Sequence, residues 1–360
     1  MLKPLQSLDP ARFDNPRVLK SLNAASRSLA ELKGVIASIP NQGILINTLG
    51  IQEAKDSSAI ENIVTTHDDL YREDSFPENV KSAATKEVYR YRQALGVGFD
   101  LVKSSNLITV NHLVQIQAEL LSSGAGIRTL PGTALKNYQG QVVYTPPQVH
   151  EEILHHFRDL EQFINDPTAF DADPLIKMAL AHHQFESIHP FYDGNGRTGR
   201  ILNVLYLVKE SLLNIPILYL SRPLVQSKSE YYRLLQAVRE QDSWEDWVVY
   251  MLWAVESSAI DAVVTVGAIR KALADTKFQI RSQHKFYSQD LINLLFSHPY
   301  TRIEFLVSGL SVTRITATKY LEALVESGIL EKRKIGRCNY YVNIALWAIL
   351  VGPRMRTRAD

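Results

Sequence analysis

One stretch of the sequence, from His189 to Arg200, concentrates side chains that can act on a phosphate group. It reads His189-Pro-Phe-Tyr-Asp-Gly-Asn-Gly-Arg-Thr-Gly-Arg200. Gly194 and Gly196 bracket Asn195, so the backbone can turn sharply there and present successive N–H groups to an anion. A helix that begins at this point adds its own free N–H groups and the positive end of its dipole. The stretch therefore predicts an anion-binding loop.

Four side chains of the same stretch add chemistry to this loop. Arg197 and Arg200 are three residues apart, so they share a helix face and can clamp several phosphate oxygens. Asp193 suits Mg²⁺, which prefers few carboxylates together with phosphates and water. His189 is the one nearby side chain whose ordinary pKa suits proton transfer at neutral pH. Together these residues predict a site for a nucleotide phosphate with a general base beside it.

The elements that must position this loop are mainly helices. The pattern of apolar residues and helix-start signals predicts helices near 17–38, 50–72, 77–103, 109–121, 147–165, 173–187, 197–213, 228–241 and 243–275. Short β-prone stretches at 133–135 and 142–144 flank turn-forming residues and predict a hairpin. Because an isolated hairpin is marginally stable, it should rest on the helical core.

The pattern changes near residue 280. Helices are predicted at 288–297, 300–306 and 311–327. Residues 328–337 and 340–342 then form two predicted strands around a basic turn. This order of elements is typical of a winged helix. On the third of these helices the residues expected to face the core are Ile315, Ala317, Leu321 and Leu324, with Arg314 and Lys319 exposed. The predicted fold class is mainly α, with a small β-hairpin flap and a C-terminal winged helix-turn-helix domain.

Composition bounds the class of protein. Of 360 residues, 46% are apolar and 21% charged, as in an ordinary globular protein. Cys338 is the only cysteine, so no internal disulfide can form. No signal peptide and no apolar run of about 18 residues is apparent, so a cytoplasmic location without membrane contact is expected. From residue 280 onward there are 12 Lys and Arg and 6 Asp and Glu, so this region has a net charge of +6. The net charge of the whole chain is +1.

The stretch from His189 to Arg200 matches the Fic-family signature, H-x-F-x-[D/E]-G-N-G-R-x-x-R, at every specified position. Members of the family mostly transfer AMP from ATP to Ser, Thr or Tyr of target proteins. The resemblance implies that His189 deprotonates the target hydroxyl and that Asp193 holds Mg²⁺ between the α- and β-phosphates. It also implies the phosphate contacts: Gly194, Asn195 and Gly196 around the phosphates, Arg197 on the β/γ side and Arg200 on the γ-phosphate.

Two other segments look like family sequence. Residues 126–147 resemble the flap, which docks the target segment by backbone pairing. The flap residues expected along the nucleotide are Thr133, Ala134, Leu135 and Lys136. Residues 230–232 also resemble the family, with Tyr231 or Tyr232 stacking on adenine or, alternatively, packing in the core.

An upstream segment, Ser57-Ser-Ala-Ile-Glu61-Asn62, resembles the family's inhibitory motif, [S/T]-x-x-x-E-[G/N]. Ser57 and Glu61 are four apart and would share one helix face. In relatives this glutamate pairs with the second arginine of the signature, here Arg200, and so removes the clamp for the γ-phosphate. The resulting division is 1–105 with an inhibitory helix at 50–72, a catalytic core at 106–278 with a flap at 128–147, and a winged helix at 279–360.

Other functions stay open from the sequence. A de-AMPylase with Glu61 aligning a water, or a transferase of another phosphate-containing donor, would use the same residues. A zinc hydrolase would use His182, His183, Glu186 and His189. A DNA-binding regulator would use Arg314, Lys319 and the basic turn at 332–337. The expected partners are ATP, an unidentified target protein, a second copy in a homodimer, and DNA.

Overall fold

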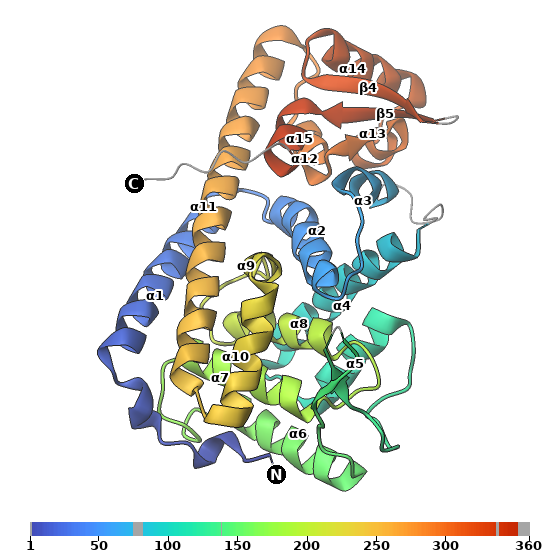
Figure 1. Ribbon diagram of the computed structural model, residues 1–360. Coiled ribbons are helices and arrows are strands. Elements are labelled where there is room, and N and C mark those ends of the chain that lie inside the picture. Colours follow the sequence, from blue (N-terminus) through green and yellow to red (C-terminus); the bar gives the residue numbers. More distant parts are fainter. Residues whose placement is uncertain (1, 75–81, 138, 336–337, 352–360) are drawn as a thin grey trace.

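The computed structural model describes residues 2–74, 82–137, 139–335 and 338–351 (Figure 1). Helices make up most of it, with one two-stranded hairpin and one three-stranded sheet. The predicted mainly α fold is therefore confirmed.

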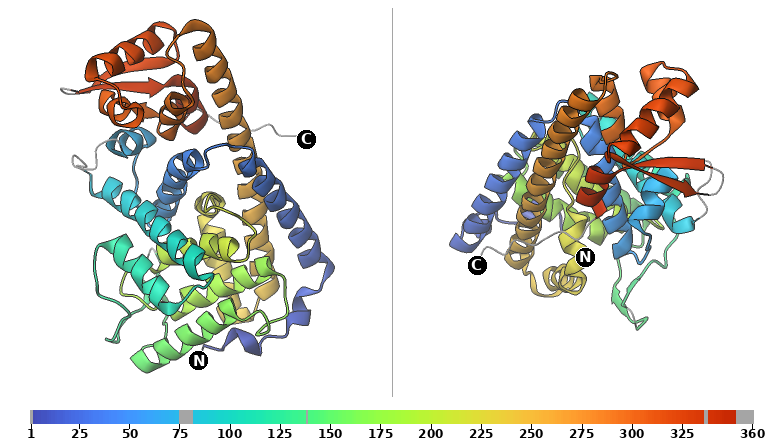
Figure 2. Two further views of the ribbon diagram at one scale, coloured as in Figure 1. Left: turned by 180° about the vertical axis from the view of Figure 1, so that it is seen from behind. Right: turned by 90° about the horizontal axis from the view of Figure 1, so that it is seen from above.

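The N-terminal region consists of short 3₁₀ helices followed by longer α-helices. Its elements are η1 (Leu5–Ser7), η2 (Pro10–Phe13), α1 (Pro16–Ala37), α2 (Gly43–Ile60), α3 (His67–Asp74) and α4 (Ala83–Ser105). The start of helix α1 is stabilised by an N-cap. The Asn15 side chain accepts hydrogen bonds from two first-turn N–H groups, and Pro16 occupies the first helical position. It packs along α11 (Trp244–Gln283), as both views in Figure 2 show.

The single helix expected at 50–72 is wrong: two helices occupy this stretch. Helix α2 stops at Glu61 because Asn62 adopts the left-handed conformation, with φ 62°, and the N–H of Ile63 turns back to the carbonyl of Ser58. Asparagine is one of the few residues that tolerate this helix-ending geometry. Helix α2 also begins earlier than expected, at Gly43. The expected start of the next helix, at 77–81, lies outside the described residues.

The central region holds the predicted catalytic stretch. Its elements are α5 (Val110–Leu121), β1 (Leu135–Lys136), β2 (Val142–Tyr144), α6 (His150–Asn165), α7 (Pro174–Ile188), α8 (Asn195–Lys209), α9 (Ser221–Gln226), α10 (Lys228–Gln241) and α11. Helix α7 is buried from Leu175 to Ile188 and packs against α8, so the loop that joins them is held on both sides by the core. Helix α9 was not predicted.

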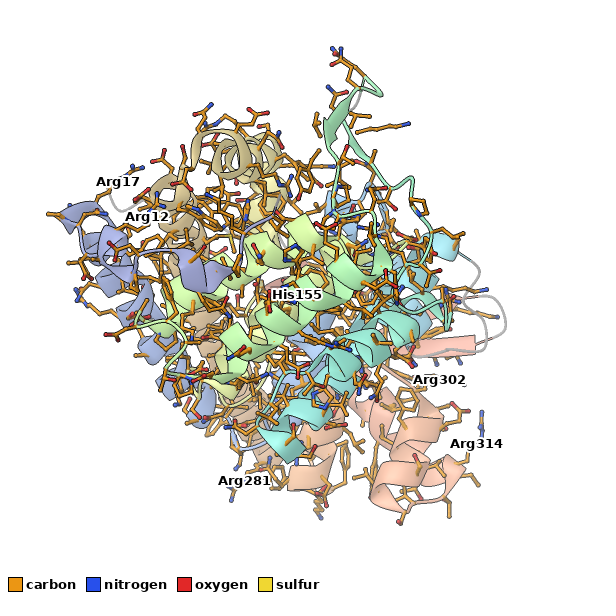
Figure 3. The ribbon with its side chains drawn as sticks, turned by 90° about the horizontal axis from the view of Figure 1, so that it is seen from below. Arg12, Arg17, His155, Arg281, Arg302 and Arg314 are labelled. Carbon is orange, nitrogen blue, oxygen red and sulfur yellow. The ribbon has the colours of Figure 1, made fainter. Side chains whose placement is uncertain are left out.

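The hairpin is real but short. Strand β1 pairs antiparallel with β2, with an irregular register between Leu135 and Lys136. Thr133 and Ala134, which were expected in the first strand, precede it. The hairpin extends away from the helical body (Figure 3).

In the described part of the chain, α11 alone is long and apolar enough, by length and composition, to cross a membrane. Half of its most apolar 18-residue window is buried inside the protein. Residues such as Trp247, Met251 and Val255 lie in the core. Core helices of this kind pass the same length and composition test.

The C-terminal region contains α12 (Gln289–Ser297), β3 (Tyr300–Thr301), α13 (Ile303–Leu310), α14 (Arg314–Glu326), β4 (Leu330–Ile335), β5 (Cys338–Asn343) and α15 (Ile344–Val351). The strand order is β3-β5-β4, all antiparallel. Three helices followed by a hairpin are compatible with the predicted winged helix. Strand β3 and helix α15 were not expected, and the end of the basic turn, at 336–337, lies outside the described residues.

One expected core residue of this region is wrong. Ala317, Leu321 and Leu324 are fully buried, but Ile315 is 84% exposed. Ile315 lies two residues before Ala317, and two residues along a helix correspond to roughly 200° of rotation. Its side chain therefore points to the opposite face of α14, beside the exposed Arg314.

The C-terminal region packs directly on α2, as Figure 1 shows. Nε2 of Gln52 donates a buried hydrogen bond to the carbonyl of Leu350 in α15, at 2.9 Å. The ring of Tyr71, whose hydroxyl bonds the carbonyl of Thr48 in α2, contacts Trp347 edge-on. The helix that ends at Glu61 is thus held between the core and the C-terminal region.

Candidate active site

The loop between α7 and α8 has a backbone built for a tight turn. His189 ends α7 in the left-handed conformation, with φ 49°, and Gly194 precedes α8 with φ 80°. The side chain of Asn195 closes the loop, because it accepts from the N–H of Phe191 at 2.9 Å and donates to the carbonyl of the same residue at 2.8 Å. Asn195 thus serves the loop with its side chain, and only its backbone N–H remains for an anion.

The start of α8 supplies the backbone donors of this loop. The first hydrogen bond within α8 runs from the N–H of Thr198 to the carbonyl of Gly194. The N–H groups of Asn195, Gly196 and Arg197 therefore lie in the first turn, where helices leave donors for ligands. Gly196 also allows a close approach: a Cβ there would lie 2.4 Å from Oε1 of Glu61.

His189 is held as a neutral imidazole. Burial lowers its pKa to about 4, and the nearby charge of Arg128 adds to this shift. At neutral pH the ring is therefore deprotonated and can accept a proton from a hydroxyl.

Sequence reasoning missed the role of Arg128, which lies at the base of the flap. Its buried guanidinium donates from Nε to the carbonyl of His189 at 2.8 Å, and from Nη2 to the carbonyls of Ile188 and Pro147. Its own N–H donates to the carbonyl of Pro190 at 2.9 Å. A lone arginine before a hairpin carries no sequence signal for such a role. The fold nevertheless ties the flap to the catalytic loop through it.

Arg200 is enclosed by the end of α2. Its Nε donates to Oγ of Ser57 at 2.8 Å, and its Nη2 donates to the carbonyl of Ser57 at 3.0 Å and to Oε1 of Glu61 at 2.8 Å. Burial raises the pKa of Glu61, but the charge and hydrogen bond of Arg200 outweigh it, so the pKa is lowered overall. The structure thus brings Ser57, Glu61 and Arg200 together.

Arg197 has a different partner, which the sequence did not reveal. Its Nη1 lies 2.8 Å from Oε2 of Glu87 on α4, and its Nη2 lies 3.8 Å from Oδ1 of Asp193. The Arg197 side chain is buried, whereas that of Asp193 is 74% exposed. Asp193 therefore presents its carboxylate outward at the loop, as a single ligand for Mg²⁺ shared with phosphates would require.

The flap is attached to the loop by Tyr192, which lies at an unspecified position of the signature. The hydroxyl of Tyr192 accepts from the N–H groups of Thr129 and Leu130, at 2.9 and 3.1 Å. Nε2 of Gln148 donates to the carbonyl of Thr133 at 2.9 Å. Thr133, Ala134 and Leu135 are half-buried and Lys136 is exposed. Their contact with a nucleotide stays a prediction.

The two candidate adenine-stacking tyrosines have different environments. Tyr231 is buried and its hydroxyl lies 2.8 Å from Nε2 of His182, as the alternative of packing in the core expects. Tyr232 is 45% exposed, with its ring edge-on to that of Tyr231. Tyr232 is therefore the tyrosine of this pair whose ring is exposed to a nucleobase.

His182 and His183, which a zinc hydrolase would use as ligands, contact backbone carbonyls in the core. Nδ1 of His182 lies 3.2 Å from the carbonyl of Gly199, and Nε2 of His183 lies 3.2 Å from that of Leu235. Burial lowers the pKa of both. Within the described ranges, no group of three or more His, Cys, Asp or Glu residues is placed to hold a metal ion. The site favours phosphate chemistry over zinc hydrolysis.

The basic side chains proposed to meet DNA have acidic partners. Arg314 pairs with Glu304 at 2.8 Å, Lys332 with Glu322 at 2.5 Å and Arg333 with Glu331 at 2.9 Å. Each pair reduces the local positive charge that would attract phosphates. DNA binding stays a prediction that these contacts do not favour.

The fold and the site define a helical protein in which the loop between two buried helices brings together a histidine, the N–H groups of a helix start and two arginines. Family models match most of the chain: the Fic/DOC family N-terminal model over residues 19–100, the Fic/DOC family model over 107–207, and the protein adenylyltransferase SoFic-like C-terminal domain over 273–346. The chain belongs to the Fic/DOC family.

Relatives and solved structures agree with this assignment. The chain is 25% identical over 142 residues to protein adenylyltransferase fic-1 of Caenorhabditis elegans, covering 39% of this chain and 26% of that protein. It is 30% identical over 142 residues to protein adenylyltransferase Fic of Aedes aegypti, covering 39% and 27%. The matches thus span about a quarter of these relatives' length.

Two solved structures share the fold. A Fic family protein from Desulfovibrio desulfuricans G20 has a TM-score of 0.59 at 20% identity, over 91% of this chain and 96% of that chain. Fic-1 from C. elegans has a TM-score of 0.53 at 21% identity, over 70% and 74%.

Proposed function

We propose that this protein transfers AMP from ATP to a Ser, Thr or Tyr hydroxyl of a target protein. The observation that carries the proposal is the junction of α7 and α8. There a neutral His189 precedes an anion-binding helix start whose first turns carry Arg197 and Arg200. The relatives named protein adenylyltransferase support the same reaction.

The reaction follows from these groups. The target hydroxyl oxygen attacks the α-phosphorus while His189 takes its proton, and the bond to the β-phosphate breaks to release pyrophosphate. The helix start and the two arginines hold and neutralise the phosphates, so positioning and charge supply most of the rate. Asp193 would hold Mg²⁺, which neutralises phosphate charge when it is bound.

The proposal includes inhibition by Glu61. Because Nε and Nη2 of Arg200 are bonded to Ser57 and Glu61, these donors are not available to a γ-phosphate, and ATP would bind without the contacts that position it for reaction. The expected partners are ATP and a protein target. A homodimer, duplex DNA and a cytoplasmic location stay predictions.

Labelled ATP tests this function. The parent protein, Glu61→Gly and Glu61→Gly/His189→Ala would be incubated with Mg²⁺ and ATP labelled on either the α- or the γ-phosphate. Protein-bound label from the α-phosphate alone, strong only in the single variant, is the expected result. Label from the γ-phosphate would instead indicate phosphate transfer. Absence of label from all three proteins with a panel of target lysates would reject AMP transfer.

A further inference from the structure

We propose that Glu87 is a positioning residue, which orients Arg197 for the β/γ side of ATP. The inference rests on the proposed function and assigns a role to a residue outside the signature. Glu87 lies on α4, more than a hundred residues before its partner, and α4 packs against α8. Nη1 of Arg197 bonds Oε2 of Glu87 at 2.8 Å.

The bond matters because Arg197 is buried. Its side chain is 4% exposed, while that of Glu87 is 34% exposed. A buried guanidinium needs a bonded anion, since burial of an unpaired charge is costly. Within the described part of the chain, Glu87 is the carboxylate hydrogen-bonded to Arg197. Oδ1 of Asp193 lies 3.8 Å from Nη2 of Arg197, and the Arg197 charge also lowers the pKa of Glu61.

The two arginines of the signature are held in different ways. Arg200 makes three hydrogen bonds to the end of α2, so its Nε and Nη2 donors are occupied. Arg197 makes one, from Nη1, and its Nε is buried without a hydrogen-bond partner. Its Nη2 lies on the side of the loop residue Asp193. Glu87 thus holds Nη1 of Arg197 and leaves Nε and Nη2 as donors for phosphate oxygens.

The positions of the two glutamates in their helices point to the same difference. Glu61 caps the C-terminal end of α2, next to the left-handed Asn62, where a small backbone change can move it. Glu87 lies in the second turn of α4, after the N-cap Ser82, whose side chain accepts from the N–H of Thr85. Glu87 is therefore placed to hold an arginine and not to swing away from it.

Kinetics in the active background test this role. Adding Glu87→Ala to Glu61→Gly should raise the KM for ATP at least tenfold with a smaller change in kcat, because Arg197 loses its orientation before ATP binds. Glu87→Gln should be less affected, since its amide oxygen can still accept from Nη1. Asp100→Ala, which removes an exposed carboxylate from the same helix, is the matched control and should leave KM unchanged.

A second measurement separates this inference from the proposed function. Calorimetric titration of Mg²⁺ and ATP into Glu61→Gly/His189→Ala, with and without Glu87→Ala or Glu87→Gln, reports binding without turnover. Weaker binding in the Glu87→Ala variant, with binding by Glu87→Gln closer to that of the background protein, supports the inference even if no target is ever labelled. Unchanged KM and unchanged binding would overturn it. So would higher AMP transfer by Glu87→Ala in the parent chain, because Glu87 would then be a second inhibitory carboxylate.

Discussion

Nη2 of Arg200 lies 2.8 Å from Oε1 of Glu61, and Nε of the same guanidinium bonds the Ser57 side chain one helical turn earlier. The Arg200 side chain is 1% exposed, so water does not screen this pair strongly. The helix that supplies both partners also bonds the C-terminal region through Gln52. The pairing therefore depends on where the whole of α2 is held.

Glu61→Gly is expected to raise AMP transfer well over tenfold, a change equivalent to at least about 1.4 kcal/mol of barrier. The reason is that Arg200 regains donors for the γ-phosphate. Initial rates of label incorporation measure this. Asn62→Gly is a matched control, because it adds a glycine where the backbone is already left-handed and leaves Glu61 in place. Equal rates in Glu61→Gly and the parent would reject the inhibitory pair.

The pH profile of Glu61→Gly should have its acid limb near pH 4 and not near pH 6.5. Burial and Arg128 lower the pKa of His189 to about 4, so the ring stays deprotonated above that value and protonates below it. Measuring kcat/KM from pH 4 to 8 checks this. Circular dichroism at each pH is needed as a control for folding. Burial lowers the pKa of His182 to about 3 in the folded protein, whereas the same imidazole in the unfolded chain takes up a proton below about pH 6.5. Stability therefore falls as the pH drops through that window. A limb near pH 6.5 with folded protein would contradict a buried, neutral base.

Asp193→Ala should lower transfer by Glu61→Gly at least tenfold at a fixed Mg²⁺ concentration. Asp193 is the exposed carboxylate of the loop, and Mg²⁺ would lose its protein ligand. Titration of Mg²⁺ against rate measures the effect. Activity should also survive a chelator selective for Zn²⁺ and disappear when Mg²⁺ is removed. Loss of activity on Zn²⁺ chelation alone would contradict this prediction and support the zinc-hydrolase alternative.

Two substitutions on α14 test the corrected orientation of that helix. Leu321→Ala should lower the free energy of unfolding by about 2–5 kcal/mol, because a fully buried side chain leaves a cavity. Ile315→Ala should change it by less than about 0.5 kcal/mol, since that side chain is 84% exposed. Urea unfolding followed by circular dichroism measures both. Similar losses for the two variants would contradict the observed helix face.

Local sequence patterns were enough to predict the helical fold class and the turn that joins His189 to the start of α8. Both follow from short-range rules: apolar spacing defines helices, and glycines around Asn195 define a turn before a helix. The order of His189, Asp193, Arg197 and Arg200 along one short stretch also places them together without any long-range information. The same short-range rules misplaced Ile315, and they merged α2 and α3, because a helix face and a helix end depend on which neighbours pack there.

Tertiary structure alone decided which distant groups meet. Nothing in the local pattern indicates that Glu87 on α4 bonds Arg197, that Arg128 holds the carbonyl of His189, or that Gln52 bonds Leu350. These are contacts between segments far apart in the chain. They form because polar groups that packing removes from water need hydrogen-bond partners, and these partners come within reach only once the helices have packed.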